Sequence, residues 1–255
     1  MVNFGRFRET VVRERFDRIA DTYDDTIVRR REVYNDAVDQ MVAARCPRPV
    51  DRPVRLLDAA CGTGARWEHL RTLLPHACAW GLDASENMCA LARQRDCFED
   101  VAHADLTRLP WPDDHFDVIT CLFFSFCYLT SDPARLGALQ EMRRVLRPGG
   151  LLVVDVINVW HRGEGLQYAR TRLGVGWDYL KSWLDPRLRP GDKLYRTPYG
   201  RGSLRGYFHG FTHRSFHDML RAADFTDDEL LTVGYNSGQL REDPWQGQIL
   251  ALVRK

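Results

Sequence analysis

The chain has 255 residues, 44% hydrophobic and 28% charged, so it is long enough to bury one substantial core. The net charge of +1 excludes a protein that depends on bulk attraction to nucleic acid or anionic lipid. The charged N-terminal stretch does not resemble a signal peptide, and no window approaches the roughly 18 apolar residues of a membrane span. Seven cysteines without a C-x-x-C pair favour reduced thiols in the cytoplasm over a disulfide framework or a metal site.

The first fifty residues are predicted to form a helical cap. Apolar residues recur at helical spacing from Phe16 to Tyr23 and again from Val33 to Met41. Three prolines between residues 46 and 53 end this pattern. We therefore treat residues 1–50 as a unit that precedes the main domain.

Short apolar runs then alternate with helical stretches. Because the runs are not broken by polar residues, they indicate a parallel sheet that is covered on both faces, the α/β class. The pattern predicts strands at 54–58, 78–83, 117–123 and 151–156, and helices near 65–74, 86–94 and 133–146.

The segment 158–210 has a different texture. It holds ten Lys or Arg residues against four Asp or Glu residues, together with nine aromatic residues, and shows no clean period. Such a long irregular insertion is more often functional than idle, so we expect a substrate lid here. The main domain would resume at 211–255, where Thr212 caps a helix over 213–223 and strands follow near 229–234 and 247–253.

The run LLDAACGTG, residues 56–64, ends a predicted strand with an acid and two glycines. A phosphate-binding Walker loop would need a lysine, which is missing. A dinucleotide loop would need a third glycine, but Trp67 stands there and prevents close approach of helix and strand. The loop therefore indicates a ligand without phosphate.

Three acids stand at strand ends: Asp58 and Asp83 end two of the predicted strands, and Asp105 lies past a further strand indicated between residue 83 and the strand at 117–123. Asp58 would repel a pyrophosphate but suits an ammonium group, and Asp83 is placed to accept both hydroxyls of a ribose. Asp105, just past a third strand, could accept from an adenine amine. An amino acid, a ribose and an adenine without phosphate describe S-adenosylmethionine.

The motifs resemble those of the class I S-adenosylmethionine-dependent methyltransferases over about residues 12–255. The resemblance is carried by VRLLDAACGTG, GLDASENM, HADLTRLPWPDDHFDVI and EMRRVLRPGGLLVVDV, in that order, although Ala60 replaces the usual glycine. It implies a Rossmann-like fold: a doubly wound, mostly parallel sheet of seven strands, with the helical cap in front and the lid inserted after the fifth strand.

The resemblance also implies roles for individual residues. The methionine half of the cofactor would lie against Ala60, Gly62 and Gly64, and the ribose on Asp83. The adenine would lie between Ala84 and Met88, with Asp105 and Leu106 at its edge. Cys121 and Leu122 would lie under the sulfonium, and Tyr23 would close over the site.

Simpler interpretations stay open for several of these residues. Asp83 could cap the helix that starts near residue 86, and Asp105 could be a turn residue. Met88 could be core filler, and Tyr23 could pack between helices. His213 and His217 lie one helical turn apart, but solvated or packing histidines are the default, and we predict no metal site.

A looser resemblance, to glycine and sarcosine N-methyltransferases, suggests the acceptor. Asp155 and Asn158 match a D-x-x-N pattern after the fifth strand, whereas Phe124 replaces an expected polar residue. By this similarity Asn158 would bond a polar group of the substrate, or else cap a turn. Tyr128, Asn158 and His161 are the candidate catalytic residues, because ligands of open α/β sheets lie beyond the carboxyl ends of the strands.

The expected reaction is methyl transfer to a small polar or anionic metabolite, most favourably at nitrogen. Lid arginines would suit a carboxylate or phosphate on the substrate, the candidates being Arg162, Arg170, Arg196, Arg201 and Arg205. The alternatives are O- or C-methylation of a metabolite, methylation of a nucleic acid, and a protein that binds the cofactor without transferring the methyl group.

Overall fold

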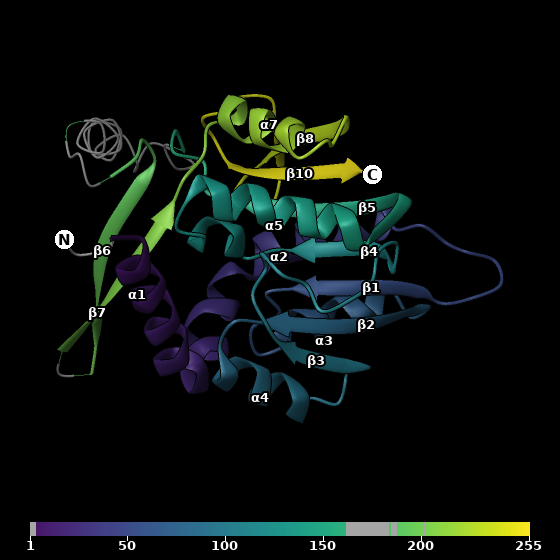
Figure 1. Cartoon of the computed structure of the whole chain (residues 1–255), viewed down its shortest axis with the longest axis horizontal. Helices are drawn as coiled ribbons and strands as arrows, with labels where there is room; N and C mark the ends of the chain where they lie inside the picture. Colours follow the sequence, from purple (N-terminus) through teal and green to yellow (C-terminus); the bar gives the residue numbers. More distant parts are fainter. Residues whose placement is uncertain (1–3, 162–183, 185–187, 201) are drawn as a thin grey trace.

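The computed structural model describes residues 4–161, 184, 188–200 and 202–255. An eight-stranded sheet runs through the centre in the order β3-β2-β1-β4-β5-β10-β8-β9 (Figure 1). The first five of these strands in the order pair in parallel, and β10 runs antiparallel to β5 and β8. The predicted α/β fold with a mostly parallel sheet is thereby confirmed. The strands are β1 (Val54–Ala59), β2 (Ala77–Asp83), β3 (Asp100–His103), β4 (Phe116–Cys121), β5 (Leu146–Val156), β8 (Asp227–Val233), β9 (Leu240–Arg241) and β10 (Gln248–Arg254).

The expected strand number, seven, is too low by one. The extra strand, β9, is an edge strand of two residues that pairs with Thr232 and Val233 of β8. The chain reverses just before it, where Gly238 adopts a φ of +65° and Gly234 N–H donates to the Gln239 carbonyl at 2.8 Å. A strand of two residues is too short to show the period-two alternation by which strands are predicted.

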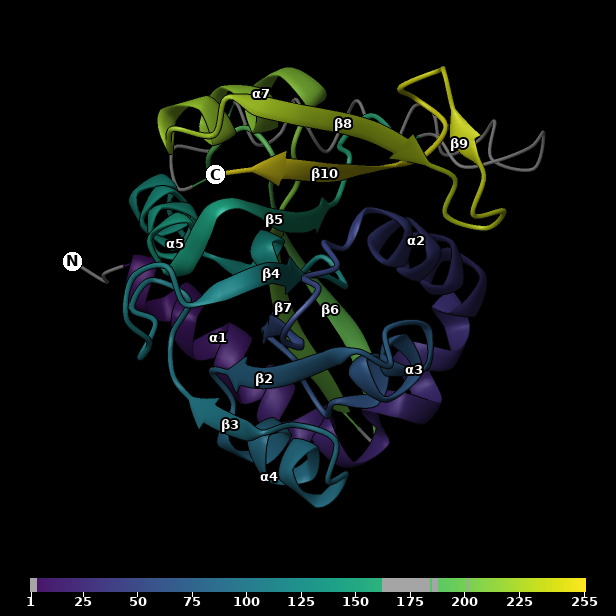
Figure 2. The same cartoon turned by 90° about the vertical axis from the view of Figure 1, so that its right-hand side faces the viewer.

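Four helices lie between or beside the strands: α3 (Ala65–Leu73), α4 (Glu86–Gln94), α5 (Asp132–Val145) and α7 (His213–Ala222). Side chains cap three of them, since Ser85, Ser131 and Thr212 each accept a backbone N–H of the first turn. The predicted cap at Thr212 is therefore confirmed. Helices α2 (Glu32–Arg45) and α3 cover one face of the sheet, and α5 and α7 cover the other (Figure 2).

The N-terminal region is helical, as expected, but it is not one helix. Helix α1 (Phe4–Ile19) and helix α2 are joined by a 3-10 turn, a π turn and a second 3-10 turn over residues 20–31. Helix α1 lies at the end of the sheet toward which the arrows of β1, β2 and β4 point (Figure 1). It therefore stands over the edge where ligands of open α/β sheets bind.

Part of the predicted lid is regular, contrary to expectation. Strands β6 (Asp192–Tyr199) and β7 (Gly202–His209) form an antiparallel hairpin along their whole length. Gly206 allows this pairing, because a Cβ there would lie 2.3 Å from Cζ of Tyr195 on the facing strand. The buried side chains of β7 include Leu204 and Tyr207, and β7 packs against α1. Because most of β6 is exposed, including the apolar side chain of Leu194, the hairpin leaves only a weak hydrophobic pattern in the sequence.

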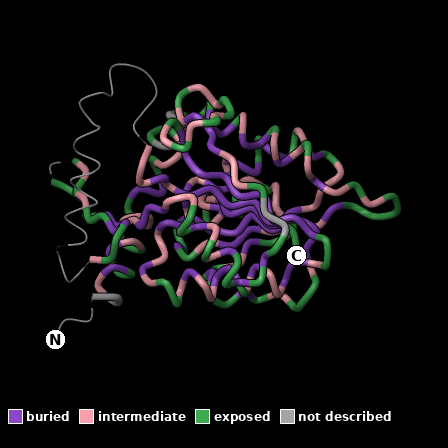
Figure 3. Tube along the Cα trace, turned by 90° about the horizontal axis from the view of Figure 1, so that it is seen from above, coloured by how far each residue is buried: buried purple, intermediate pink, exposed green. Residues whose placement is uncertain are grey.

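The core follows the central strands (Figure 3). Val118, Ile119, Leu152, Val153 and Val154 are fully buried. Burial of one such aliphatic side chain stabilises the fold by about 1.5–3 kcal/mol, so these strands are a rigid base for the loops that follow them. Within the described residues, no helix combines the length and the apolar character that a membrane crossing requires.

Candidate active site

A cavity of about 240 Å³ lies beyond the carboxyl ends of β1, β2 and β4. Residues 58–66 form one wall, residues 82–88 and 105–107 form a second, and residues 122–130 form a third. Helix α1 closes the cavity on the opposite side. The cavity is therefore built jointly by the strand ends of the main domain and by the N-terminal helix.

The glycine loop forms the floor of the cavity by its backbone. Ala60, Gly62 and Gly64 all adopt a positive φ, of 66°, 55° and 81°. Ala60 and Gly62 line the cavity. Gly64 does not: it begins α3, and a Cβ there would lie 2.9 Å from the ring of Phe98. Glycine is needed at position 64 for close packing, because a side chain there would both strain the backbone and collide with Phe98.

Asp58 ends β1 and lines the cavity while it is almost fully buried. Its Oδ1 accepts a hydrogen bond from Thr120 Oγ at 2.9 Å. Burial raises the pKa of Asp58 to about 6, although the Thr120 bond and Arg66 lower it. A carboxylate held this way is costly to keep ionised without a cation, so the site favours a positively charged ligand group.

Asp83 ends β2 and is tied to both loops around it. Its Oδ2 accepts from Gly62 N–H at 2.9 Å, and its Oδ1 accepts from Ser85 N–H at 2.8 Å. Burial raises its pKa, and these backbone bonds lower it. The carboxylate is thus held on the cavity wall with lone pairs left for a ligand. The helix cap itself is Ser85, not Asp83. Ala84 and Met88 line the same wall.

Asp105 and Leu106 line the cavity after β3. Asp105 Oδ1 accepts from Thr107 N–H at 2.8 Å and from Thr107 Oγ at 2.7 Å. The residue therefore forms a turn and also faces the cavity, so the two interpretations of it are compatible.

The end of β4 carries backbone strain next to the cavity. Phe123 and Phe124 are consecutive and have φ values of 64° and 62°, which bulky residues rarely adopt. Phe124 N–H donates to buried Asp155 Oδ1 at 2.7 Å, and its ring packs on Tyr34. Asp155 thereby holds the strained turn, which gives this acid a structural role.

The two residues predicted to lie under the sulfonium differ in position. Leu122 and the neighbouring Phe123 line the cavity. Cys121 is fully buried and is not among the lining residues. Burial also raises its pKa well above the usual value, so it stays a neutral thiol. It is the last residue of β4, a strand that is buried along its whole length.

Two tyrosines line the cavity. Burial raises the pKa of Tyr23 to about 12. Tyr128 lies in the 3-10 helix η4 (Ser125–Tyr128), and its ring meets that of Phe16 edge to face at 4.9 Å. Burial also raises the pKa of Tyr128. Both side chains therefore stay neutral at physiological pH and can donate or accept hydrogen bonds but not carry charge.

Asn158 and His161 are not among the residues that line the cavity. The Asn158 amide donates to the carbonyls of Pro244 and Gly247, at 2.6 and 2.9 Å, and its Oδ1 accepts from Trp160 N–H. Asn158 therefore joins the loop after β5 to the loop before β10. The structure does not support a substrate contact by Asn158, because its amide is already engaged by the protein. His161 follows in the same loop.

Two features of the site were missed from the sequence. One face of α1, formed by Glu9, Val12, Arg13 and Phe16, lines the cavity. Val12, Arg13 and Phe16 follow Glu9 by three, four and seven positions, which is the spacing of one helix face. This spacing is the signal by which the sequence could have indicated the lining face. The other is Arg66, buried in the first turn of α3, whose Nε and Nη2 bond Asp39 Oδ1 at 2.9 and 2.6 Å.

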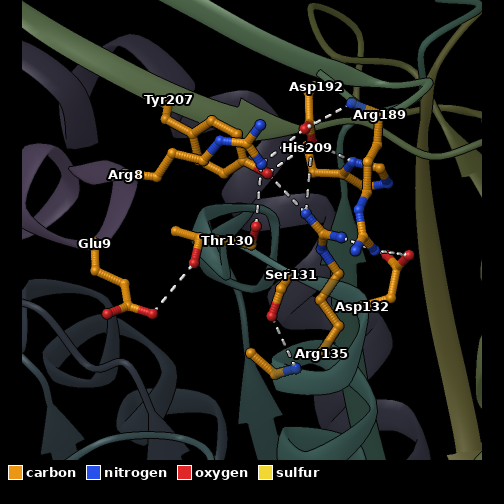
Figure 4. A network of polar contacts seen from close by, with 11 residues as sticks. Arg8, Glu9, Thr130, Ser131, Asp132, Arg135, Arg189, Asp192, Tyr207 and His209 are labelled. Atoms are coloured by element: carbon orange, nitrogen blue, oxygen red, sulfur yellow. Dashed lines mark hydrogen bonds and ion pairs between the residues drawn. The ribbon is translucent and has the colours of Figure 1, made fainter. Parts of the chain in front are cut away.

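A buried network joins α1, the hairpin and α5 (Figure 4). Asp192 accepts from Tyr207 Oη at 2.7 Å and from His209 Nδ1 at 2.9 Å, and pairs with Arg8 at 2.9 Å. Arg135 of α5 donates to the Tyr207 hydroxyl at 2.8 Å. Although burial raises the pKa of Asp192, its hydrogen bonds lower it to about 2. The carboxylate therefore stays ionised and holds α1 against the hairpin.

The predicted lid arginines do not gather at the cavity in the described residues. Arg196 and Arg205 lie on the hairpin and are not among the lining residues. Arg162, Arg170 and Arg201 lie outside the described residues. Likewise, no group of three or more metal-binding side chains occurs in the described ranges.

Comparisons with known proteins agree with this geometry. Residues 56–150 match the family model of a methyltransferase domain. The chain is 37% identical over 142 residues to a demethylmenaquinone methyltransferase of Clavibacter sepedonicus, covering 54% of this chain and 55% of that protein. It is 33% identical over 144 residues to a malonyl-[acyl-carrier protein] O-methyltransferase of Dechloromonas aromatica, covering 56% and 49%. The chain thus spans about half the length of these curated relatives.

Solved structures resemble the chain over more of its length. A SAM-dependent methyltransferase from Thermotoga maritima aligns with a TM-score of 0.61 at 18% identity, covering 94% of this chain and 98% of that one. An amino pentose methyltransferase from Micromonospora echinaspora with SAM bound aligns with a TM-score of 0.54 at 24% identity, covering 89% and 92%. Residues 56–150 are therefore a methyltransferase domain, in a chain with the class I fold of the S-adenosylmethionine-dependent methyltransferases.

Proposed function

We propose that the protein transfers the methyl group of S-adenosylmethionine to a small polar metabolite, most favourably at nitrogen. The observation that carries the proposal is the cavity itself. Asp58, Asp83 and Asp105 line it at the ends of three strands, and residues of helix α1 line it as well. A cavity of about 240 Å³ suits a small acceptor better than a polymer.

The chemistry of the cavity wall fits this cofactor. Asp58 would bind the ammonium group, Asp83 the ribose hydroxyls and Asp105 the adenine edge. Arg66 supplies independent support, because its Nη1 is buried without a hydrogen-bond partner while the side chain lines the cavity. A buried unpaired guanidinium N–H costs free energy, and a carboxylate such as that of the methionine half would satisfy it.

When bound, the cofactor supplies a methyl group that is already activated as a sulfonium. The protein's own contribution is then alignment and exclusion of water, for which correct positioning is worth about 7–11 kcal/mol. Tyr128 stands on the wall beyond the glycine loop and can orient the acceptor through its hydroxyl. Leu122 and Phe123 keep the reaction space apolar.

The lining residues limit how the acceptor can lose its proton. In the described part of the chain, the cavity wall has no histidine or lysine, so a carboxylate such as that of Glu9 is the proton acceptor that the wall offers. A neutral amine can attack directly, whereas an alcohol must lose its proton during transfer. Relatives include an O-methyltransferase, and a solved structure of similar fold is a sugar N-methyltransferase, so O- and C-methylation are the alternatives to test.

The test uses cofactor with a radiolabelled methyl group, incubated with the protein and with either a small-molecule extract or total RNA. We expect label in the small-molecule pool, with mass analysis naming the acceptor atom. Label in RNA would overturn the proposal. Tight cofactor binding without transfer to either pool would indicate a cofactor-binding protein that lacks turnover.

A further inference from the structure

We propose that Glu9 of helix α1 recognises an amino group of the acceptor, so that the substrates are small amine-bearing molecules. This inference rests on the proposed function and names the substrate class of the same cavity.

The first step is a comparison of the charged groups on the cavity wall. Among the described residues that line it, four carry a carboxylate and two carry a guanidinium. Three of the carboxylates, Asp58, Asp83 and Asp105, follow β1, β2 and β3 and are assigned to the cofactor. Glu9 comes from α1 and is not among the three carboxylates assigned to the cofactor.

Glu9 also has more hydrogen-bonding capacity to spare than the three aspartates. Each aspartate accepts at least one hydrogen bond of 2.7 to 2.9 Å from the protein. Glu9 Oε1 accepts from Thr130 Oγ at 3.4 Å, longer than the 2.5–3.0 Å usual for hydroxyl donors. Glu9 is solvent-exposed, so a ligand that brings N–H donors would replace water at the open acceptor positions of this carboxylate.

The position of Glu9 is fixed by its neighbour. Arg8 pairs with buried Asp192 at 2.9 Å and donates to the Thr130 carbonyl at 3.3 Å. Figure 4 shows Glu9 directed toward Thr130, next to this network. The same contacts that clamp α1 onto the hairpin therefore fix the backbone from which Glu9 reaches the cavity wall. Such pre-organisation lowers the entropic cost of binding.

The surroundings of Glu9 suit an amine at its carboxylate, while the Arg13 guanidinium lies one helical turn away on the same lining face. Val12 and Phe16 lie on the same helix face, and the Phe16 ring meets Tyr128. Aromatic faces attract a cation, and a carboxylate repels an anionic group. A nitrogen bound by Glu9 would thus lie within an aromatic and acidic corner of the cavity.

Glu9 lies outside the part of the chain that matches the methyltransferase domain model, residues 56–150. The acceptor specificity would therefore reside in α1, a segment separate from the cofactor loops. This separation allows a mutation to change acceptor binding while leaving cofactor binding intact.

The test compares wild type, Glu9→Gln, Glu9→Asp and the matched control Glu14→Gln. Glu14 is exposed on α1 and does not line the cavity. Each protein is incubated with labelled cofactor and a small-molecule extract. Unreacted S-adenosylmethionine, which is itself a cation, is removed chromatographically, and the labelled products are then separated on a cation exchanger at mildly acidic pH. Methylated amines are retained there, whereas O- or C-methylated molecules without an amine are not. Affinity for S-adenosylhomocysteine is measured for every variant by calorimetry.

We expect the wild-type label in the retained fraction. For the purified acceptor, Glu9→Gln should lower kcat/KM about ten- to hundredfold, mainly through KM. Glu9→Asp should keep part of the activity, and Glu14→Gln all of it. S-adenosylhomocysteine affinity should stay within about twofold throughout, which also shows that the variants fold.

Two results would overturn the inference while leaving methyl transfer to small molecules intact. One is wild-type label that appears only in the unretained fraction. The other is a Glu9→Gln variant that methylates a retained product as well as Glu14→Gln does. Absence of label in small molecules with wild-type protein would instead refute the proposed function itself.

Discussion

The cavity has two halves that are held together by different kinds of contact. The strand-end half, formed by the loops after β1, β2 and β3, combines bonds between close neighbours, such as Asp83 with Ser85 and Asp105 with Thr107, with a longer one from Thr120 to Asp58. The cap half, formed by α1 and the β6–β7 hairpin, depends on bonds across 122 residues, from Arg8 to Thr130, and 182 residues, from Arg15 to Thr197. The first half is therefore visible as sequence motifs, whereas the second exists only once the chain has folded.

The largest effect is expected from a substitution that disrupts the cap half. Asp192→Ala removes the shared acceptor of Arg8, Tyr207 and His209, leaving buried groups unpaired. We expect the free energy of unfolding to fall by about 3–5 kcal/mol, measured by denaturant titration.

The control is Asp218→Ala, which removes an exposed acid whose contact with Arg214 is 3.9 Å long and should change stability by less than about 1 kcal/mol. A small effect of Asp192→Ala would show that the network does not hold the cap half together.

The next largest effect is expected from a substitution in the strand-end half, measured as a loss of ligand affinity. Asp83→Ala leaves the N–H groups of Gly62 and Ser85 without their acceptor and removes the proposed ribose ligand. Affinity for S-adenosylhomocysteine should fall about a hundredfold, a loss of about 3 kcal/mol, by isothermal titration. Glu86→Ala, an exposed neighbour at the start of α4, should leave affinity nearly unchanged. Equal affinities of wild type and Asp83→Ala would remove Asp83 from the cofactor site.

A smaller effect should appear with pH. The folded-state pKa of Asp58, raised by burial to about 6, means that the empty site is protonated below that pH. The cofactor ammonium needs the carboxylate, so binding must expel that proton at low pH. S-adenosylhomocysteine affinity should be flat above pH 6 and fall by up to about tenfold per unit below it.

Burial also raises the pKa of Asp83 and that of Asp155, so Asp58→Asn is needed to isolate the contribution of Asp58. The variant should bind more weakly at pH 7.5 and lose less affinity on acidification. Parallel pH profiles of the two proteins would contradict the assignment of the ammonium group to Asp58.

The smallest effect concerns Ala60, whose φ of 66° is unfavourable for a residue with a Cβ. Ala60→Gly should relieve about 1–2 kcal/mol of strain, partly offset by about 0.4–1 kcal/mol from the greater freedom of the unfolded chain. We expect a net gain near 0.5 kcal/mol in thermal or denaturant unfolding. Ala59→Gly, in the regular strand β1, should destabilise instead, and equal effects would exclude strain at residue 60.

The sequence predicted the strand-end half well because its elements are short-range. The glycine loop, Asp58, Asp83 and Asp105 each follow an apolar run, and the edge of a parallel sheet brings them together. The D-x-x-N pattern misled for Asn158, since its amide partners at Pro244 and Gly247 come from a loop almost ninety residues further on. Glu9 was missed because the residue spacing predicts that a helix has one continuous face, but not which part of the protein that face will contact.

Helix α1 forms one whole side of the cavity through Glu9, Val12, Arg13 and Phe16, and none of these belongs to the matched domain. Substitutions on that face can therefore alter the acceptor while the sheet, the glycine loop and their folding energetics stay as they are. The architecture is modular in an evolutionary sense. New acceptor preferences can arise by drift at the exposed positions of one helix, such as Glu9 and Arg13, without the stability cost that mutations in a buried core carry.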